Sequence, residues 1–249
     1  MKRQTSFRLI ALLGAALLVV VAAGVSQPAS AAPLEEGIAI AIVYDTSGSM
    51  SDAVRDSRGR MSPKYLIASR ALTAIVDRLQ AVATNTAAGA PRKLEAGLFA
   101  FDGQKASEAV KFGPFDPDAL RSWMRSFSRP NGPTPLGESV RVAGQAVLAS
   151  KLSRKHVLVL TDGVNTAGRE PADTIPRVQA DAVRNGAVVG YHFVAFDVNA
   201  NEFARVKKLG ATVVGAGDEK QLQSQLEFIL EEKILLEAEE PAPGSKSKK

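Results

Sequence analysis

The sequence predicts an α/β fold, a doubly wound and mostly parallel central sheet with helices on both faces. Short apolar runs rich in β-branched residues alternate with segments of helical periodicity over most of the 249-residue chain. Several of these runs are almost continuously apolar, which is typical of strands that are covered on both faces. Polar clusters directly follow two of the runs, where parallel sheets bind their ligands. The alternation predicts one domain, from residue 37 to residue 236.

The expected strands are apolar segments that end at polar or small residues. They are Gly37–Tyr44, Leu94–Phe101, Ala109–Phe112, Lys155–Thr161, Ala187–Phe196 and Ala211–Val214. The first, fourth and fifth of these are short continuous apolar runs, which predicts that they are buried. Leu94–Phe101 alternates instead, and the turn at Asp102-Gly103 after it predicts that the chain returns as a short strand.

The expected helices fill the intervals between the strands. They are Pro63–Leu79, Asp116–Phe127, Leu136–Ser150, Ala172–Asn185, Glu202–Leu209 and Asp218 to about Leu236, with loops at Thr84–Pro91 and Ser128–Pro135. Pro63 suits a first helical turn, and Asp116 suits an N-cap. Asn185-Gly186 and Gly210 are typical helix stops.

The N-terminus has the pattern of an export signal. Three basic residues, Lys2, Arg3 and Arg8, precede an uncharged run from Leu9 to Val25. Ala29-Ser30-Ala31 then supplies the small residues of a signal-peptidase site. We therefore predict a signal peptide at residues 1–31 and an exported protein, periplasmic or secreted, with no membrane span in its mature form. An uncleaved anchor is the alternative, because roughly 17 apolar residues already approach the length of a spanning helix.

The composition excludes several kinds of function. The net charge of +5 falls to +2 without residues 1–31, which gives no argument for nucleic-acid binding. The absence of cysteine excludes disulfides, thiolate chemistry and cysteine-based zinc sites. Residues 237–249 are acidic, then rich in proline, glycine, serine and lysine, and we predict that they form a disordered basic tail.

A polar motif follows the first predicted strand. Asp45, Ser47 and Ser49 place three oxygen-bearing side chains at alternate positions as the strand leaves the sheet. Because alternate residues of an extended segment point the same way, we expect these side chains to converge, with Gly48 allowing a tight turn.

Two further oxygen-bearing side chains are expected at the same edge. Asp162 follows the strand Lys155–Thr161, and Thr134 lies in a proline-rich loop that leads into a helix. All five residues offer hard oxygen ligands, which suit Mg²⁺, Mn²⁺ or Ca²⁺ rather than zinc or copper. Two carboxylates only balance a divalent ion. If the hydroxyls bind the ion directly, it stays electrophilic and takes a carboxylate from outside.

These residues carry a resemblance to a known family. Asp45-Thr46-Ser47-Gly48-Ser49-Met50 is similar to the metal-ion-dependent adhesion site (MIDAS) of von Willebrand factor type A (VWA) domains. Thr134 resembles the family's threonine and Asp162 its late aspartate, and the likeness spans roughly residues 37–236. It implies that the two serines and the threonine bind the metal directly, while the aspartates act largely through water. It also implies cation-dependent protein binding, in which a partner offers a Glu or Asp carboxylate, and no catalysis.

Other functions remain as alternatives. A metal-dependent hydrolase would use the same ion, and an envelope assembly factor would use it only to stabilise the fold. The chain lacks a phosphate loop of the Gly-x-x-x-x-Gly-Lys type, so nucleotide binding is not expected. Both histidines, His156 and His192, fall within predicted strands, which favours a structural role over that of a base.

A basic segment follows the motif. Arg55, Arg58, Arg60 and Lys64 lie within fifteen residues of Ser49. The simpler interpretation is a solvated loop. The alternative is that the loop lies beside the ion and helps to select an acidic partner.

Overall fold

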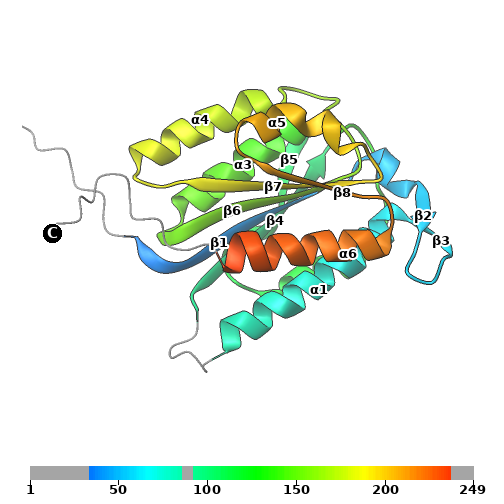
Figure 1. Cartoon of the computed structure of the whole chain (residues 1–249), viewed down its shortest axis with the longest axis horizontal. Coiled ribbons are helices and arrows are strands. Elements are labelled where there is room, and N and C mark those ends of the chain that lie inside the picture. Colours follow the sequence, from blue (N-terminus) through cyan, green and yellow to red (C-terminus); the bar gives the residue numbers. More distant parts are fainter. Residues whose placement is uncertain (1–33, 86–91, 237–249) are drawn as a thin grey trace, which may run out of the picture. The chain divides into compact units, whose positions relative to one another are not determined.

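A six-stranded sheet forms the centre of the structure, a computed structural model that describes residues 34–85 and 92–236 (Figure 1). The predicted signal peptide at 1–31, most of the loop at 84–91 and the predicted tail at 237–249 lie outside the described residues. Within the described ranges, no helix is both long enough and apolar enough to cross a membrane.

The strand order is that of a doubly wound sheet. The strands are β1 (Glu35–Tyr44), β4 (Leu94–Asp102), β5 (Lys105–Pro114), β6 (Leu152–Thr161), β7 (Val189–Phe196) and β8 (Thr212–Ala216). They lie in the order β5-β4-β1-β6-β7-β8, and every neighbouring pair is parallel except β4 and β5. The order reverses between β1 and β6, so the carboxyl ends of these two strands form the switch point where such sheets bind ligands.

Helices cover both faces of the sheet (Figure 1). They are α1 (Lys64–Thr84), α2 (Pro117–Ser126), α3 (Leu136–Ala149), α4 (Pro171–Arg184), α5 (Ala204–Lys208) and α6 (Glu219–Phe228). Ile40 and Ile42 of β1 pack with α1, α2 and α6, while Ala41 and Val43 pack with α3, α4 and α5. Burial on both faces explains why β1 is apolar at every position from Ile38 to Tyr44. The predicted fold class is thus confirmed.

Several element boundaries differ from those predicted. Pro63 precedes the first helical residue, and α1 runs five residues beyond Leu79. β5 is a full partner of β4 rather than a short return strand. The last predicted helix divides into α6 and a π-helical segment, η3 (Ile229–Leu235), and Glu202–Leu209 divides into a 3₁₀ turn, η2 (Ala200–Phe203), and α5.

One structural element was not predicted. A two-stranded hairpin, β2 (Ala53–Arg55) and β3 (Met61–Pro63), connects the polar motif to α1. Its strands have only three residues each, which is too short to carry a periodic signal. The predicted loop here is therefore replaced by an ordered hairpin at the carboxyl edge of the sheet.

Candidate metal centre

The end of β1 is organised by the carboxylate of Asp45. Its Oδ1 accepts a hydrogen bond from the Ser47 backbone N–H at 2.8 Å, and its Oδ2 accepts one from the Thr161 hydroxyl at 2.6 Å. The side chain is completely buried. Asp45 thus fixes the start of the motif to the neighbouring strand β6.

The two serines of the motif converge with Asp162. The hydroxyl oxygens of Ser47 and Ser49 lie 3.2 Å apart, and the Ser49 hydroxyl donates to Asp162 Oδ1 at 2.9 Å. The expected convergence is found, but its expected cause was wrong. Ser49 lies in a 3₁₀ turn, η1 (Gly48–Ser51), so a turn and not an extended alternation brings the hydroxyls together.

The proline-rich loop brings Thr134 to the same place. Gly48 N–H donates to the carbonyl of Gly132 at 3.1 Å, and Asn131 N–H donates to the carbonyl of Thr46 at 2.8 Å. A Cβ built on Gly163 would lie 3.8 Å from Thr134 Oγ1 and 4.0 Å from Ser49 Oγ. The five side chains predicted from the sequence therefore lie together, and we call their oxygens the oxygen cluster: Asp45, Ser47, Ser49, Thr134 and Asp162.

The hydroxyl of Thr134 has no role in holding the fold. The residue is 4% exposed, and its backbone N–H donates to the Thr166 hydroxyl at 2.8 Å. Its own hydroxyl makes no hydrogen bond to any residue in the described ranges, and the helix α3 starts after Pro135 without a side-chain cap. The oxygen is not among the fully buried unpartnered atoms of the described residues, so it is accessible and could bind a ligand without breaking a bond of the fold.

Lys64 is part of the site and was missed. Its ammonium lies 3.1 Å from Asp162 Oδ2 and 2.9 Å from Asp197 Oδ2, and the residue is only 5% exposed. Its place beside Arg55, Arg58 and Arg60 in the sequence favoured a solvated loop. A signal was present, because Lys64 shares a helix face with Ala68, Ala71 and Ile75, which are all buried.

Asp197 was also missed, although a sequence signal for it was present. It directly follows β7, so the rule that placed Asp45 and Asp162 at the sheet edge also applied to it. Its backbone has a φ of 56°, the only positive value of a non-glycine residue in the described part of the chain. An aspartate tolerates this left-handed conformation better than most residues, and here the conformation accompanies the contact with Lys64.

Burial and neighbouring charges set the ionisation of the cluster. Burial raises the pKa of Asp45 to about 6, and the charge of Asp162 adds to the rise. Burial opposes the charge of Lys64, but its hydrogen bonds to Asp197 and Asp162 outweigh this effect and raise its pKa. Together with Asp197 and Lys64, the two carboxylates of the cluster have a formal net charge of −2. A divalent cation would balance this charge.

The cluster fits a hard divalent cation. Its oxygens lie 2.9 and 3.2 Å apart, close to the separation of about 3 Å between neighbouring ligands around Mg²⁺. Within residues 34–85 and 92–236, no three His, Asp or Glu side chains form a ready metal cage. An ion at this edge would therefore depend on the hydroxyls, as the sequence analysis expects.

The hairpin beside the cluster is held rigidly. Asp56 accepts hydrogen bonds from the backbone N–H groups of Arg58 and Arg60 at 2.9 and 2.8 Å. The Ser57 N–H donates to Glu219 on α6 at 2.7 Å. These bonds leave the side chains of Arg55 and Arg58 exposed on a fixed frame. The basic segment is thus an ordered rim.

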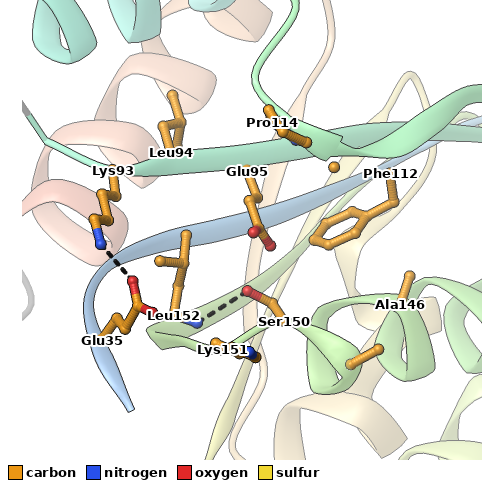
Figure 2. A pocket seen from close by; sticks show the side chains of 12 residues that line it. Glu35, Lys93, Leu94, Glu95, Phe112, Pro114, Ala146, Ser150, Lys151 and Leu152 are labelled. Atoms are coloured by element: carbon orange, nitrogen blue, oxygen red, sulfur yellow. Dashed lines mark hydrogen bonds and ion pairs between the residues drawn. The ribbon is translucent and has the colours of Figure 1, made fainter.

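A pocket of about 600 Å³ lies at the opposite end of the sheet, near the amino ends of β1, β4 and β6 (Figure 2). Figure 2 shows the ion pair of Glu35 with Lys93 at its mouth and the side chains of Glu95 and Phe112 along its wall. The described lining contains no row of hydroxyls comparable to the oxygen cluster. The pocket and the candidate metal centre are therefore separate features.

Comparisons with known proteins indicate the fold. No family model and no curated protein matches the chain. The PilB minor pilin from Streptococcus sanguinis matches with a TM-score of 0.58 at 17% identity, over 83% of this chain and 62% of the pilin. PTMP1 from the mussel byssus, in a structure with a zinc-occupied MIDAS motif, matches at 0.56 and 16%, over 80% of this chain and 48% of that protein.

A third match is an isolated domain. The SpRpn10 VWA domain has a TM-score of 0.53 at 11% identity, and the match covers 77% of this chain and 94% of that domain. By contrast, the chain spans about three fifths of the pilin and about half of the mussel protein. At such identities the likeness concerns the fold alone. The chain has the doubly wound α/β fold of von Willebrand factor type A domains.

Proposed function

We propose that the chain is a divalent-cation-dependent protein-binding domain, used for adhesion or scaffolding. The observation that carries this proposal is the convergence of the Ser47, Ser49 and Thr134 hydroxyls beside Asp162, where the Thr134 hydroxyl bonds no described residue. The Thr134 oxygen is not among the fully buried unpartnered atoms of the described residues, so it stays accessible for a bond to a ligand. A cation held by Thr134 and the two serines would supply that bond.

The oxygen cluster favours Mg²⁺, with Mn²⁺ or Ca²⁺ as alternatives. Ser47, Ser49 and Thr134 would hold the ion through neutral oxygens, while Asp45 and Asp162 supply the balancing charge. When bound, such an ion acts as a Lewis acid for an oxygen ligand from outside. A Glu or Asp side chain of a partner protein is the ligand that this site would take.

The other features of the chain agree with this proposal. A minor pilin and a thread matrix protein of the mussel byssus, the latter with a zinc-occupied MIDAS motif, share the fold. The N-terminal export pattern places this chain outside the cytoplasm, by our prediction. The ordered basic rim of the hairpin β2–β3 would favour an acidic partner.

We propose binding rather than catalysis. His156 and His192 are buried in β6 and β7, with ring nitrogens 3.2 Å apart, and neither lies in the oxygen cluster. The carboxylate with a raised pKa, Asp45, accepts hydrogen bonds at both oxygens and is completely buried. A hydrolase would need a base that can reach a substrate, so this alternative lacks an observation in its favour.

Magnesium titration tests the site, with a matched pair of variants. Ser49→Ala removes a hydroxyl of the cluster, whereas Ser51→Ala removes an exposed hydroxyl two residues away in the same turn. We expect Mg²⁺ to raise the melting temperature of the wild type and of Ser51→Ala but not that of Ser49→Ala. Equal responses of the two variants would contradict the assignment.

Partner capture needs a second experiment. The mature protein, immobilised, is incubated with envelope extract in Mg²⁺ or in chelator, beside Ser49→Ala and Ser51→Ala. We expect the same protein to be retained by the wild type and Ser51→Ala in Mg²⁺ only. A partner retained equally in chelator would refute cation-dependent binding, and a metal response without any partner would favour a structural metal.

A further inference from the structure

The buried ammonium of Lys64 contacts one of the two carboxylate oxygens of Asp162, so the two oxygens have different neighbours. Oδ1 accepts the hydrogen bond of Ser49 at 2.9 Å and so faces the hydroxyls. Oδ2 lies 3.1 Å from the Lys64 ammonium and so faces away from them. The side chain of Asp162 is fully buried, and these contacts fix its orientation.

Lys64 is itself fixed in place. It is the first residue of α1, and its backbone N–H donates to the carbonyl of Asp52 at 2.8 Å. Its ammonium also bonds Asp197 at 2.9 Å, and the Asp197 side chain is 43% exposed. The ammonium is thus held between a buried carboxylate of the oxygen cluster and a partly exposed carboxylate beside it.

An ammonium at this distance competes with a metal for the charge of Asp162. A carboxylate that bonds a cation at one oxygen offers less negative charge to a second cation at the other. A metal ion with less direct carboxylate charge keeps more of its affinity for a carboxylate from outside. The position of Lys64 therefore affects the binding of a metal and the binding of a partner in opposite directions.

We infer that Lys64 is a positioning residue that holds Asp162 back from a cation at the hydroxyls and so preserves that cation's affinity for an outside carboxylate. This inference rests on the proposed function. It assigns Lys64 a task that a merely structural ion pair would not have. Asp197 moderates this task, because it draws part of the hydrogen bonding of the ammonium away from Asp162.

Two titrations with defined probes test the inference. Calorimetry measures the affinity for Mn²⁺ alone, and water-proton relaxation of the Mn²⁺-loaded protein measures the affinity for acetate, a simple carboxylate. In Lys64→Met we expect Mn²⁺ to bind about tenfold more tightly and acetate about tenfold more weakly, because the local positive charge is lost. Lys64→Arg restores both values to within about threefold of the wild type.

Two further variants keep the test sharp. Lys155→Met removes the other buried lysine of the described residues, whose ammonium bonds the carbonyls of Ser150 and Leu152, and we expect it to change neither affinity. Asp197→Asn removes the second carboxylate from the Lys64 ammonium, which then has Asp162 as its remaining ion-pair partner among the described residues. It should weaken Mn²⁺ binding and strengthen acetate binding, opposite to Lys64→Met, and it provides the answer if Lys64→Met does not fold.

The outcomes separate this inference from the proposed function. If Lys64→Met and Asp197→Asn each shift the two affinities in the same direction, or shift neither, Lys64 is only structural and the inference fails. If the wild type binds no Mn²⁺ that Ser49→Ala abolishes, the proposed function fails and the inference fails with it. Opposite shifts of the two affinities support both.

Discussion

The two ends of the sheet each bury a lysine, and the two lysines differ in what they bond. At the amino end, Lys155 is 2% exposed and donates to the carbonyls of Ser150 and Leu152 at 2.6 and 2.8 Å. At the carboxyl end, Lys64 bonds two carboxylates. Burial lowers the pKa of Lys155, with only a partial offset from Glu95, whereas its carboxylate partners raise the pKa of Lys64.

The difference separates a structural lysine from one that belongs to a charged site. Lys155 closes the turn between α3 and β6 through hydrogen bonds to carbonyls, and Glu95 acts on it only through its charge. Lys64 joins the loops after β6 and β7 through ion pairs with Asp162 of the oxygen cluster and with Asp197 beside it. A buried ammonium is thus evidence of a site only where its partners are charged and lie beside groups that remain unsatisfied.

Asp45→Ala should have the largest effect on the carboxyl end. It removes the charge closest to the motif, leaves the Ser47 N–H without its acceptor, and leaves the Thr161 hydroxyl with only the carbonyl of Gly163. We expect the affinity for Mg²⁺ to fall by about 100-fold and stability to fall by about 1–3 kcal/mol. Calorimetry and denaturant unfolding measure the two effects, with the exposed Asp52→Ala as the control. Retained Mg²⁺ binding would show that the ion lies elsewhere.

Lys155→Met should affect only the amino end. Two carbonyls lose their donor, so we expect the free energy of unfolding to fall by about 2 kcal/mol. The increase in melting temperature with Mg²⁺ should equal that of the wild type, because no residue of the oxygen cluster contacts Lys155. A lost Mg²⁺ response in a folded Lys155→Met would show that the two ends are coupled.

Thr134→Val should separate metal binding from stability. The Thr134 hydroxyl makes no hydrogen bond to the described residues, so its replacement by a methyl group should change stability by less than about 0.5 kcal/mol. The affinity for Mg²⁺ should fall about tenfold, as expected for the loss of one oxygen ligand. Thr134→Ser keeps the hydroxyl and should retain the affinity. Substantial destabilisation by Thr134→Val would instead indicate a structural hydroxyl.

The pH dependence should differ with and without metal. Because the pKa of Asp45 is raised to about 6 from the ordinary 3.8, its contribution stabilises the metal-free fold below pH 3.8 and is lost as the pH rises through about 6. Metal binding requires the ionised form, so the affinity for Mg²⁺ should fall about tenfold from pH 7 to pH 5. Thr134→Val should show the same dependence of Mg²⁺ affinity on pH, at a lower affinity. An Mg²⁺ affinity of the wild type that does not change with pH would contradict the assignment of Asp45.

Reversal of an exposed charge on the hairpin should have the smallest effect. Arg58→Glu places a negative charge on the rigid rim near the cluster, and we expect Mg²⁺ to bind up to about threefold more tightly at low salt. The gain should disappear at high salt because the charge is exposed. Lys151→Glu, at the opposite end of the sheet, is the matched control. An equal gain in both variants would exclude a local effect of the hairpin.

The fold class and the convergence of five side chains could be predicted from the sequence. Continuous apolar runs such as Ile38–Tyr44 identify buried parallel strands, and polar residues directly after them identify the sheet edge. The hairpin β2–β3 was not predictable in this way, because strands of three residues carry no periodicity. The register of the sheet, which brings Asp45 beside Leu160 and Thr161, also has no local signal.

Lys64 and Asp197 are the site residues that were not predicted from the sequence. Lysine is rarely buried, so its place among four arginine and lysine residues favoured a solvated loop. Only its inward position on α1 contradicts that interpretation, and this position becomes decisive once Asp197 is placed beside it by the fold. Contacts between loops that are far apart in sequence depend on the packed sheet and not on any motif.

The most direct test of the account is a crystal structure of the protein grown or soaked with Mn²⁺, with the ion located by its anomalous scattering. We expect one peak at about 2.1 Å from the hydroxyl oxygens of Ser47, Ser49 and Thr134, with a water or an outside carboxylate completing its ligands. Lys64 should remain bonded to Asp162. The absence of a peak there at millimolar Mn²⁺, or a peak bound directly by both Asp45 and Asp162, would contradict it.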